Sequence, residues 1–337
     1  MNKITIIIPV YNASRYIERC LDSVFMQDYP DIQCILVNDC TPDDSVPKIE
    51  SKLLAYSGHI EFRLLHQEYN KGAAAARNKG VEEADGDYLY FLDADDELEV
   101  ANSLRLLAET AMLYQSADFV QGNTRCDNVL LHELFDLSRQ NILPVSNDRK
   151  WVNEYILLYM PVTPWNKLIR RNFIIDNDLW FKEGIVLEDV LWRFWLSKKS
   201  RCIAFCMAYT YHHASNPDSV MMSKIGEKKR IQSHISILKE YMQNVSDEMK
   251  YIESFYILKD FQGCRILQVS SDNKEYHREM IVFCLVEAIL NRKIPLLFKP
   301  LFLYLLLPVS LIRGSKFLWN KSLGILFRIV KLKRNLQ

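Results

Sequence analysis

Three aspartates follow a short apolar run in the first third of the chain. The run is Tyr88–Leu92, and Asp93, Asp95 and Asp96 come directly after it. Such a run is typical of a buried strand, so its end would deliver two or three carboxylates to one point. Without Cys or His among them, these oxygens suit a hard divalent cation that bridges to substrate phosphates. A solvated acidic turn that caps a helix starting near Glu97 is the alternative, which an isolated Asp-x-Asp would favour.

The elements that position these carboxylates alternate between strand and helix over the first 120 residues, a pattern that predicts a parallel sheet. Strands are predicted at 4–10, 32–37, 62–65, 88–92 and near Phe119, and helices at 14–27, 43–57, 72–84 and 102–115. Residues 123–150 show no clear period, and 224–290 are mainly helical in pattern. The carboxyl ends of parallel strands face one crevice, where ligands bind in such folds. The ends of the first, second and fourth strands should therefore meet there.

Four sequence blocks in this region resemble those of family 2 glycosyltransferases. They are IIIPVYNASRYIERCLDSVFMQDY, ILVNDCTPDDS, NKGAAAARNKG and DGDYLYFLDADD, and they cover about residues 4–100 in the family's order and spacing. The resemblance implies the GT-A fold, which is a Rossmann-like α/β architecture with a mixed, mostly parallel sheet flanked by helices. It also implies transfer of a sugar from a nucleotide donor, as in bacterial surface-polysaccharide assembly.

The resemblance assigns a nucleotide pocket to the first two strand ends. Asp39 would accept a hydrogen bond from the nucleotide base, and Pro9, Tyr11 and Asn12 would line the same pocket. Packing alone would explain Tyr11 equally well. Most relatives carry Gly where this chain has Cys40. Because a Cβ resists a left-handed backbone, this loop is expected to differ slightly while Asp39 stays in place.

The same resemblance assigns the metal and phosphate contacts to the fourth strand end. Asp93, Ala94 and Asp95 would form an Asp-x-Asp motif for the nucleotide-sugar, with Mn²⁺ or Mg²⁺ bound by Asp95 and Asp93. Asp96 is expected to cap the following helix instead. Arg77, from the block before this strand, has two predicted partners, a phosphate or Asp93, and the sequence does not decide between them.

Blocks in the second half resemble the acceptor side of the same family. They are 164–168, 181–184 and 187–190. Inverting transfer needs a carboxylate that takes a proton from the attacking hydroxyl, and Asp189 is the predicted base. Glu188, Trp165 and Lys167 are predicted to orient the acceptor or its loop. The alternative is that two acids simply favour a helix N-terminus.

His213 stands at a departure from the family pattern. Residues 209–213 and Ser219 fall where relatives often show a Tyr-Tyr-Arg block and a downstream Ser, and His213 takes the position of the Arg. A histidine there could touch phosphate or complete the metal shell, so it is a tentative metal ligand. A packed polar residue is the alternative.

The C-terminal part is basic and apolar. Residues 288–337 carry ten Lys or Arg and no Asp or Glu, although the whole chain has no net charge. Residues 294–312 form an apolar run of nearly spanning length, but three prolines and Lys299 interrupt it. Residues 294–334 are therefore predicted to associate with an anionic membrane surface, and a core hairpin with a basic solvent face is the alternative. Nucleic acid is not an expected partner, because apolar residues separate the basic ones.

Together these patterns predict two domains. Residues 1–215 would be the GT-A domain, with a nucleotide-sugar half at 1–100 and an acceptor half at 101–215, and 216–337 a helical extension. The eight cysteines form no C-x-x-C pair, and the N-terminus opens directly on a strand, which favours a reducing compartment. The expected location is the cytoplasmic side of the inner membrane, as a peripheral protein.

The predicted reaction is a single inverting transfer of a hexosyl or N-acetylhexosaminyl group. A UDP-sugar is the expected donor, and a saccharide or lipid-linked saccharide is the expected acceptor. The Gln-x-x-Arg-Trp block of processive synthases does not occur in the sequence. Two alternatives stay open: a nucleotidyltransferase, which would normally show a Gly-rich loop after the first strand, and a catalytically degenerate membrane-bound scaffold.

Overall fold

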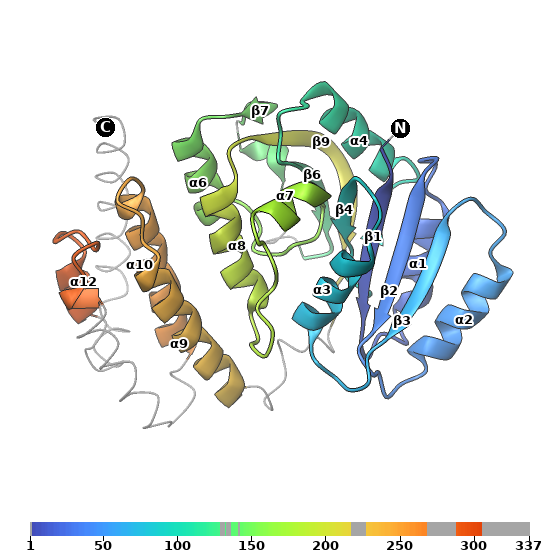
Figure 1. Cartoon of the computed structure of the whole chain (residues 1–337), viewed down its shortest axis with the longest axis horizontal. Helices are drawn as coiled ribbons and strands as arrows, with labels where there is room; N and C mark the ends of the chain where they lie inside the picture. The colour runs from blue at the N-terminus through green and yellow to red at the C-terminus, as the bar shows by residue number, and fades with distance from the viewer. Residues whose placement is uncertain are drawn as a thin grey trace. The chain divides into compact units, whose positions relative to one another are not determined.

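The computed structural model describes residues 2–128, 132, 136–140, 142–216, 227–267 and 288–304. The chain divides into two compact units, Met1–Met222 and Ser223–Gln337 (Figure 1). The first unit contains the sheet and every predicted site residue, and the second is described by itself below.

One mixed sheet forms the centre of the first unit. Its strands are β1 (Ile4–Val10), β2 (Ile32–Asn38), β3 (Glu61–His66), β4 (Tyr88–Phe91), β5 (Glu97–Leu98), β6 (Phe119–Cys126), β7 (Val145–Ser146), β8 (Lys167–Arg170) and β9 (Ile203–His213). Within the described residues the strand order is β3-β2-β1-β4-β8-β6-β9-β5, with β7 beside β9. Strands β1 to β4, β6 and β9 run in one direction, and β5, β7 and β8 run in the other. The mixed, mostly parallel sheet of the prediction is confirmed.

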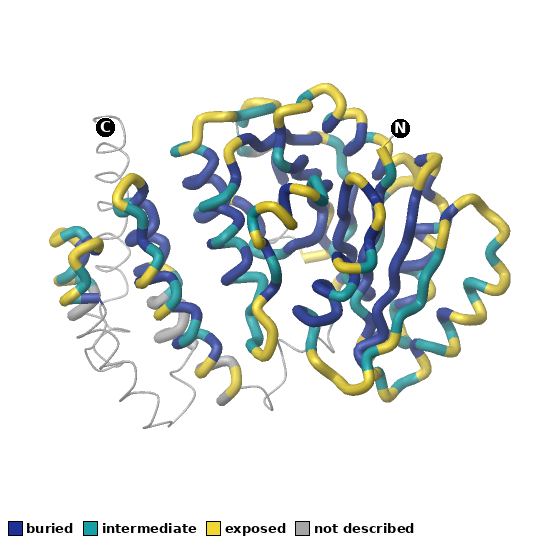
Figure 2. The backbone as a smooth tube through the Cα atoms, viewed as in Figure 1, coloured by how far each residue is buried: buried dark blue, intermediate teal, exposed yellow. Residues whose placement is uncertain are grey.

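Helices cover both faces of this sheet. They are α1 (Ile17–Phe25), α2 (Ser45–Ala55), α3 (Ala73–Glu83), α4 (Ser103–Leu113), α6 (Arg149–Leu158), α7 (Arg171–Asp176) and α8 (Glu188–Lys199), with a 3₁₀ turn at Leu137–Arg139. Alternate side chains of a strand point to opposite faces, so Ile6 and Ile8 pack with α1, α2 and α4, whereas Ile7 packs with α3, α6, α7 and α8. β1 and β2 are buried along their length, and β3 is the partly exposed edge strand (Figure 2).

The first half of the chain folds as its sequence pattern predicts, and β1 to β4 match the four predicted strands within about one residue. The helices between them are shorter than predicted by up to three residues at an end, because polar and turn residues occupy their termini. The second half departs more. β8 inserts antiparallel between β4 and β6, and β6 continues to Cys126 inside a stretch that shows no clear period. Short strands with distant partners carry little local signal.

The second unit is helical where it is described. Its helices are α9 (Glu227–Gln243), α10 (Lys250–Leu267) and α12 (Lys299–Tyr304). Tyr241 and Tyr256 are buried between α9 and α10, where their hydroxyls lie 3.2 Å apart. In the described residues, no helix combines the length and the hydropathy that crossing a membrane requires. Of the predicted membrane segment at 294–334, residues 305–334 lie outside the described part of the chain.

Candidate active site

The loops after β1, β2 and β4 meet at one edge of the sheet. Val10 lies opposite Asn38, and Ile7 lies opposite Phe91, so the three parallel strands end close to one another. Five non-glycine residues of the described chain have positive φ: Asn12, Cys40, Asn166, Asp178 and Leu187. All but Asp178 lie in loops that border this edge or hold predicted site residues. Strained backbone of this kind is typical of functional sites.

Cys40 adopts the left-handed conformation that its Cβ was expected to resist. Its φ is 54°, and the residue is exposed. The backbone at Cys40 therefore takes a conformation that glycine adopts more readily, at a strain cost. Asp39 stays in place beside it.

Replacing Cys40 with glycine is expected to raise the free energy of unfolding by about 1 kcal/mol. Left-handed backbone costs a residue with a Cβ about 1–2 kcal/mol, and the greater freedom of glycine in the unfolded chain offsets part of the gain. The midpoint of urea unfolding measures the change. Asn12→Gly, at a φ of 51°, is the matched control with a smaller expected gain, since Asn tolerates this region. Equal stability of Cys40→Gly and wild type would contradict the strain.

Asp39 links the second strand to the start of α3. Its Oδ1 accepts hydrogen bonds from Gln67 Nε2 at 3.0 Å and from the Lys71 amide at 2.7 Å, and its Oδ2 accepts one from the Gly72 amide at 2.8 Å. Gly72 has a φ of 93°, which lets its N–H turn back to the carboxylate. Asp39 is buried, so these bonds fix the wall of the predicted base pocket. A carboxylate has about four acceptor positions, which leaves one for a ligand.

Asp43 joins the two loops that carry Pro9–Asn12 and Asp39. It accepts hydrogen bonds from the Ser14 amide, from the Thr41 hydroxyl and from Ser45. Burial opposes its charge, but these bonds, led by that of Ser45, outweigh it and lower the pKa of Asp43 to about 2. These hydrogen bonds therefore hold the two loops together. Tyr11 lies in the first of them, and its side chain is 40% exposed and accessible to a ligand.

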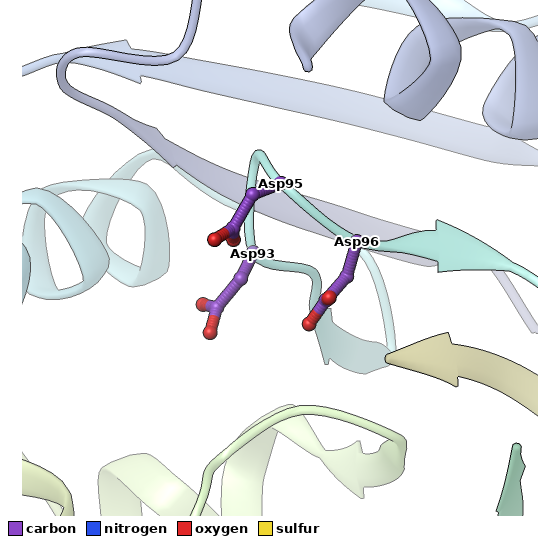
Figure 3. Close-up of side chains that lie close together, drawn as sticks. All are labelled: Asp93, Asp95 and Asp96. Atoms are coloured by element: carbon purple, nitrogen blue, oxygen red, sulfur yellow. The ribbon is translucent and has the colours of Figure 1, made fainter. Parts of the chain in front are cut away.

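The three aspartates after β4 form an acidic cluster. Asp93, Asp95 and Asp96 each place a carboxylate oxygen within 4.8 Å of the others, and Figure 3 shows the three side chains leaving the β4–β5 turn toward one side. Asp93 and Asp95 are partly exposed, whereas Asp96 is buried. Oxygen ligands without sulfur or nitrogen suit Mg²⁺ or Mn²⁺. Asp93 and Asp95 are therefore the accessible pair for the predicted metal.

Asp96 does not cap a helix, because residues Glu97–Leu98 are strand β5 and α4 begins only at Ser103. Instead it accepts hydrogen bonds from the Tyr211 hydroxyl at 2.7 Å, from His213 Nδ1 at 3.0 Å and from the Ala214 amide at 3.0 Å. Its carboxylate thus binds the last residues of β9 and the residue that follows them. Burial raises its pKa to about 6, against the opposing effect of His213.

His213 contacts Asp96, the buried member of the acidic cluster, through its Nδ1. Its ring also stacks on Trp165, with 5.5 Å between the ring centres. Burial opposes protonation of His213, but the hydrogen bond and the charge of Asp96 outweigh it and raise its pKa. This geometry supports a packed and charge-paired histidine more than the tentative metal ligand.

Arg77 forms ion pairs with two acidic residues, one of which is the predicted partner Asp93. Its Nη2 donates to Asp93 Oδ1 at 3.0 Å, and its Nη1 donates to Glu188 Oε1 at 2.7 Å. The side chain is only 7% exposed, and its guanidinium lies 5.4 Å from the centre of the Phe181 ring. Although burial opposes the charge, Asp93 and then Glu188 raise the pKa of Arg77. The arginine therefore joins the acidic cluster to the predicted acceptor side.

Glu188 and Asp189 open helix α8. Leu187, just before them, has a φ of 65°, and this turn presents both acids at the N-terminus of the helix. Burial, followed by the charge of Glu188, raises the pKa of Asp189 well above the usual range, whereas Arg77 opposes the shift. A carboxylate with a raised pKa can take a proton near neutral pH. The raised pKa and the position at the start of α8 are consistent with the predicted role of Asp189 as a general base.

Trp165 and Lys167 are buried, so the structure does not support direct contact with an acceptor. Trp165 stacks on Tyr211 with ring centres 4.5 Å apart. Lys167 Nζ donates to the carbonyls of Thr163 and Trp165. Burial, with a smaller effect from Arg193, lowers the pKa of Lys167 to about 7. These two residues shape the loop before β8.

Several residues of the site had no signal of their own in the sequence. Asn78, beside Arg77, donates to the Phe181 carbonyl at 2.8 Å and accepts from the Phe181 amide, which holds the loop before α8. Asn166, in the loop before β8, donates to Asn123 and Thr124. Asn216 donates to Asp95 at 2.6 Å. Only Asn78 and Asn166 lie inside blocks that the family resemblance covers.

Comparison with known proteins assigns the chain to a protein family. Residues 5–171 match the family described as Glycosyl transferase family 2. The chain is 30% identical over 208 residues to the uncharacterized glycosyltransferase YibD of Escherichia coli, with 57% of this chain and 55% of that protein covered. It is 26% identical to the putative glycosyltransferase EpsH of Bacillus subtilis, with 69% and 66% covered. The chain therefore spans less than two thirds of these relatives.

Solved structures share the fold at low sequence identity. The crystal structure of TarS residues 1–349 from S. aureus, in complex with UDP-GlcNAc, has a TM-score of 0.71 at 18% identity, with 90% of this chain and 87% of that chain covered. The mannosyltransferase PcManGT from Pyrobaculum calidifontis, in complex with GDP-Man and Mn²⁺, has a TM-score of 0.53 at 14% identity, with 95% and 88% covered. Through residues 5–171, this chain belongs to glycosyltransferase family 2, and its fold is that of the GT-A structures.

Proposed function

We propose that this protein transfers a single sugar, with inversion, from a nucleotide-sugar donor to a saccharide or lipid-linked saccharide. The observation that carries the proposal is the bridge made by Arg77 between Asp93 and Glu188. It joins the carboxylates suited to a donor's metal and diphosphate to the raised-pKa acid Asp189, the neighbour of Glu188. A sugar transferase needs both groups in one crevice.

In this reaction the residues of the chain have separate tasks. Asp39 and the loop at Pro9–Asn12 hold the nucleotide. Asp189 takes the proton from the attacking acceptor hydroxyl, which makes the oxygen a better nucleophile toward the sugar carbon. Arg77 keeps Glu188 beside the base and fixes Asp93 at the donor. The leaving nucleoside diphosphate departs from the opposite side of that carbon, so the configuration inverts.

The residues present fit a divalent metal. Asp93 and Asp95 offer oxygen ligands, and their oxygens lie within 4.8 Å of each other. Asp96 is buried and its carboxylate binds residues at the end of β9, so the more exposed Asp95 and Asp93 would hold the ion. When bound, Mn²⁺ or Mg²⁺ supplies positive charge to the diphosphate as it leaves. The PcManGT complex contains Mn²⁺, which supports a metal in this family's fold.

A UDP-sugar is the proposed donor, and a hexosyl or N-acetylhexosaminyl group is the group that we propose is transferred. The TarS complex with UDP-GlcNAc supports this choice. One relative acts on a phosphate-containing polymer: TarS is a poly(ribitol-phosphate) β-N-acetylglucosaminyltransferase of Staphylococcus aureus. Surface polysaccharide assembly is accordingly the proposed setting.

Release of nucleoside diphosphate tests the proposal. UDP-, GDP- and dTDP-sugars are supplied with Mn²⁺ or Mg²⁺, with and without a mixture of saccharide and lipid-linked acceptors. Release is expected from a UDP-sugar, with loss in EDTA and in Asp95→Ala. Release of pyrophosphate from a nucleoside triphosphate and sugar phosphate would instead identify the nucleotidyltransferase. No release, together with no donor-induced thermal shift in the presence of metal, would favour the scaffold.

We also propose peripheral binding at the cytoplasmic side of the inner membrane through residues 294–334. In the described part of this region and just before it, Leu290 and Leu296 are 70% and 80% exposed, beside Arg292 and Lys293. Exposed leucines with adjacent cations suit an anionic bilayer surface.

Sedimentation with vesicles is expected to show this preference. The protein should pellet with phosphatidylglycerol-containing vesicles and stay in the supernatant with pure phosphatidylcholine. The double variant Leu290→Ser/Leu296→Ser should bind less, because each buried leucine contributes about 1.5–3 kcal/mol. Leu54→Ser, at a leucine 91% exposed on α2, is the matched control. Equal pelleting with both vesicle types would count against the anionic surface.

A further inference from the structure

Asn216 contacts the acidic cluster from a distant part of the chain. Its Nδ2 donates to Asp95 Oδ2 at 2.6 Å, although the two residues lie 121 positions apart. Its Oδ1 accepts a hydrogen bond from the Tyr16 hydroxyl at 2.9 Å. A residue just before α1 and a residue after β9 are thus joined at the carboxylate that the resemblance assigns to the metal.

The chemistry of these partners fixes the orientation of the amide. An ionised carboxylate only accepts hydrogen bonds, so the amide nitrogen must face Asp95. The amide oxygen then faces Tyr16, whose hydroxyl can donate to it. The tyrosine therefore keeps Asn216 in the orientation that binds Asp95, and a wrong flip would place two oxygens against each other.

The backbone around this contact is held on both sides. On one side, Asp96 accepts the Ala214 amide at 3.0 Å, which anchors the chain two residues before Asn216. On the other, Arg19 Nη2 donates to the Asp95 carbonyl at 2.6 Å. The position of Asn216 relative to the Asp95 side chain is therefore set by the fold on both sides of the contact.

The two accessible carboxylates of the cluster differ in the charge of their partners. Asp93 is paired with the cation of Arg77 at 3.0 Å, whereas Asp95 is held by a neutral amide. A cationic partner competes with a metal for the negative charge of a carboxylate. A neutral donor orients one oxygen and leaves that charge available, and partners of this kind strengthen metal sites.

We propose that Asn216, oriented by Tyr16, is a positioning residue that aims Asp95 at the divalent cation and sets the affinity of the donor site for it. This inference rests on the proposed function, because it assumes that Asp93 and Asp95 hold the metal. It adds a determinant of affinity that lies outside the four N-terminal sequence blocks.

Titration with Mn²⁺ alone, followed by the electron paramagnetic resonance signal of the free ion, tests the inference without turnover. Asn216→Ala is expected to weaken Mn²⁺ binding by about 10-fold or more, as is typical when a partner of a metal ligand is removed. Tyr16→Phe should weaken Mn²⁺ binding less, because Asn216 loses the hydroxyl that orients it but keeps the N–H that binds Asp95. Asn216→Lys should weaken Mn²⁺ binding more than Asn216→Ala, because the lysine ammonium would pair with the Asp95 carboxylate.

The matched control is Asn177→Ala, since Asn177 bonds the Phe173 carbonyl at the end of α7, away from the cluster. It should bind Mn²⁺ as the wild type does. Thermal melting of each metal-free variant confirms that it is folded. If Asn216→Ala binds Mn²⁺ as tightly as the wild type does, the inference is wrong while the metal site stands. If the wild type binds no Mn²⁺, the proposed metal site itself is wrong.

Discussion

Asp189→Asn is expected to lower kcat by about 10²- to 10⁴-fold, the range that a positioned general base contributes. Asparagine keeps the size of the side chain and can still accept the hydrogen bond from the Val190 amide, which is 2.9 Å from Asp189 Oδ1. Only the capacity to take a proton is lost. The KM for the nucleotide-sugar should change little, because Asp189 belongs to the proposed acceptor side of the site.

Glu188→Gln is the control for this experiment. The neighbouring acid is engaged with Arg77, so its change should disturb the position of the base and cost less in kcat than Asp189→Asn. Steady-state kinetics with a saturating acceptor measure the kcat of both variants and distinguish the two roles. A larger loss in Glu188→Gln than in Asp189→Asn would exchange the two assignments.

The pH dependence of the reaction should report the same group. Burial first, then the charge of Glu188, raises the pKa of Asp189, and Arg77 opposes the rise. A base must be deprotonated to act, so kcat/KM should fall as the pH drops through this raised pKa. The acid limb is expected well above pH of about 4, where an unperturbed aspartate titrates. An acid limb at the unperturbed position, or one unchanged in Asp189→Asn, would contradict the role.

Arg77→Met is expected to lower the free energy of unfolding by about 3–5 kcal/mol, the usual cost of removing one partner from a buried ion pair. Methionine keeps the apolar stem of the side chain but lacks the guanidinium that lies over the Phe181 ring. Asp93 and Glu188, at 28% and 15% exposure, would lose their shared cation. Urea unfolding at neutral pH measures the loss.

The double variant Arg77→Met/Glu188→Gln should recover part of this stability, because one of the two unpaired charges is gone. Lys79→Met on the same helix is the matched control. Its ion pair with Glu83 is 43% exposed on the lysine side, so the loss of stability should be far smaller than in Arg77→Met. Similar losses in Arg77→Met and Lys79→Met would show that the bridge does not stabilise the fold.

Much of the candidate site could be predicted from local pattern. The apolar run at 4–10 and the run before Asp93 identify buried strands, and parallel strands bring their carboxyl ends together. The placement of Asp39, Asp93 and Asp95 at one edge follows from these two facts. The family resemblance added the predicted roles of Asp189 and Arg77, which periodicity alone does not indicate.

Other features depended on contacts between distant segments. The sequence offered Arg77 two partners, and the fold supplied Asp93 and Glu188, the latter 111 positions away. The sequence predicted that Asp96 caps a helix, whereas in the structure its side chain binds residues at the end of β9. The Cβ of Cys40 was expected to resist a left-handed backbone, whereas the fold holds this residue at a φ of 54°.

By itself the sequence determined the strand ends, the acidic residues on them and the order of the family's blocks, since hydrophobic periodicity and turn residues act over a few positions. The tertiary structure decided which polar groups pair: Arg77 with Glu188, Asp96 with Tyr211, and Asn216 with Asp95. The physical reason is that such pairs depend on the strand order, in which β8 enters between β4 and β6. Buried polar groups must find partners wherever the fold brings them, and no local pattern encodes that choice.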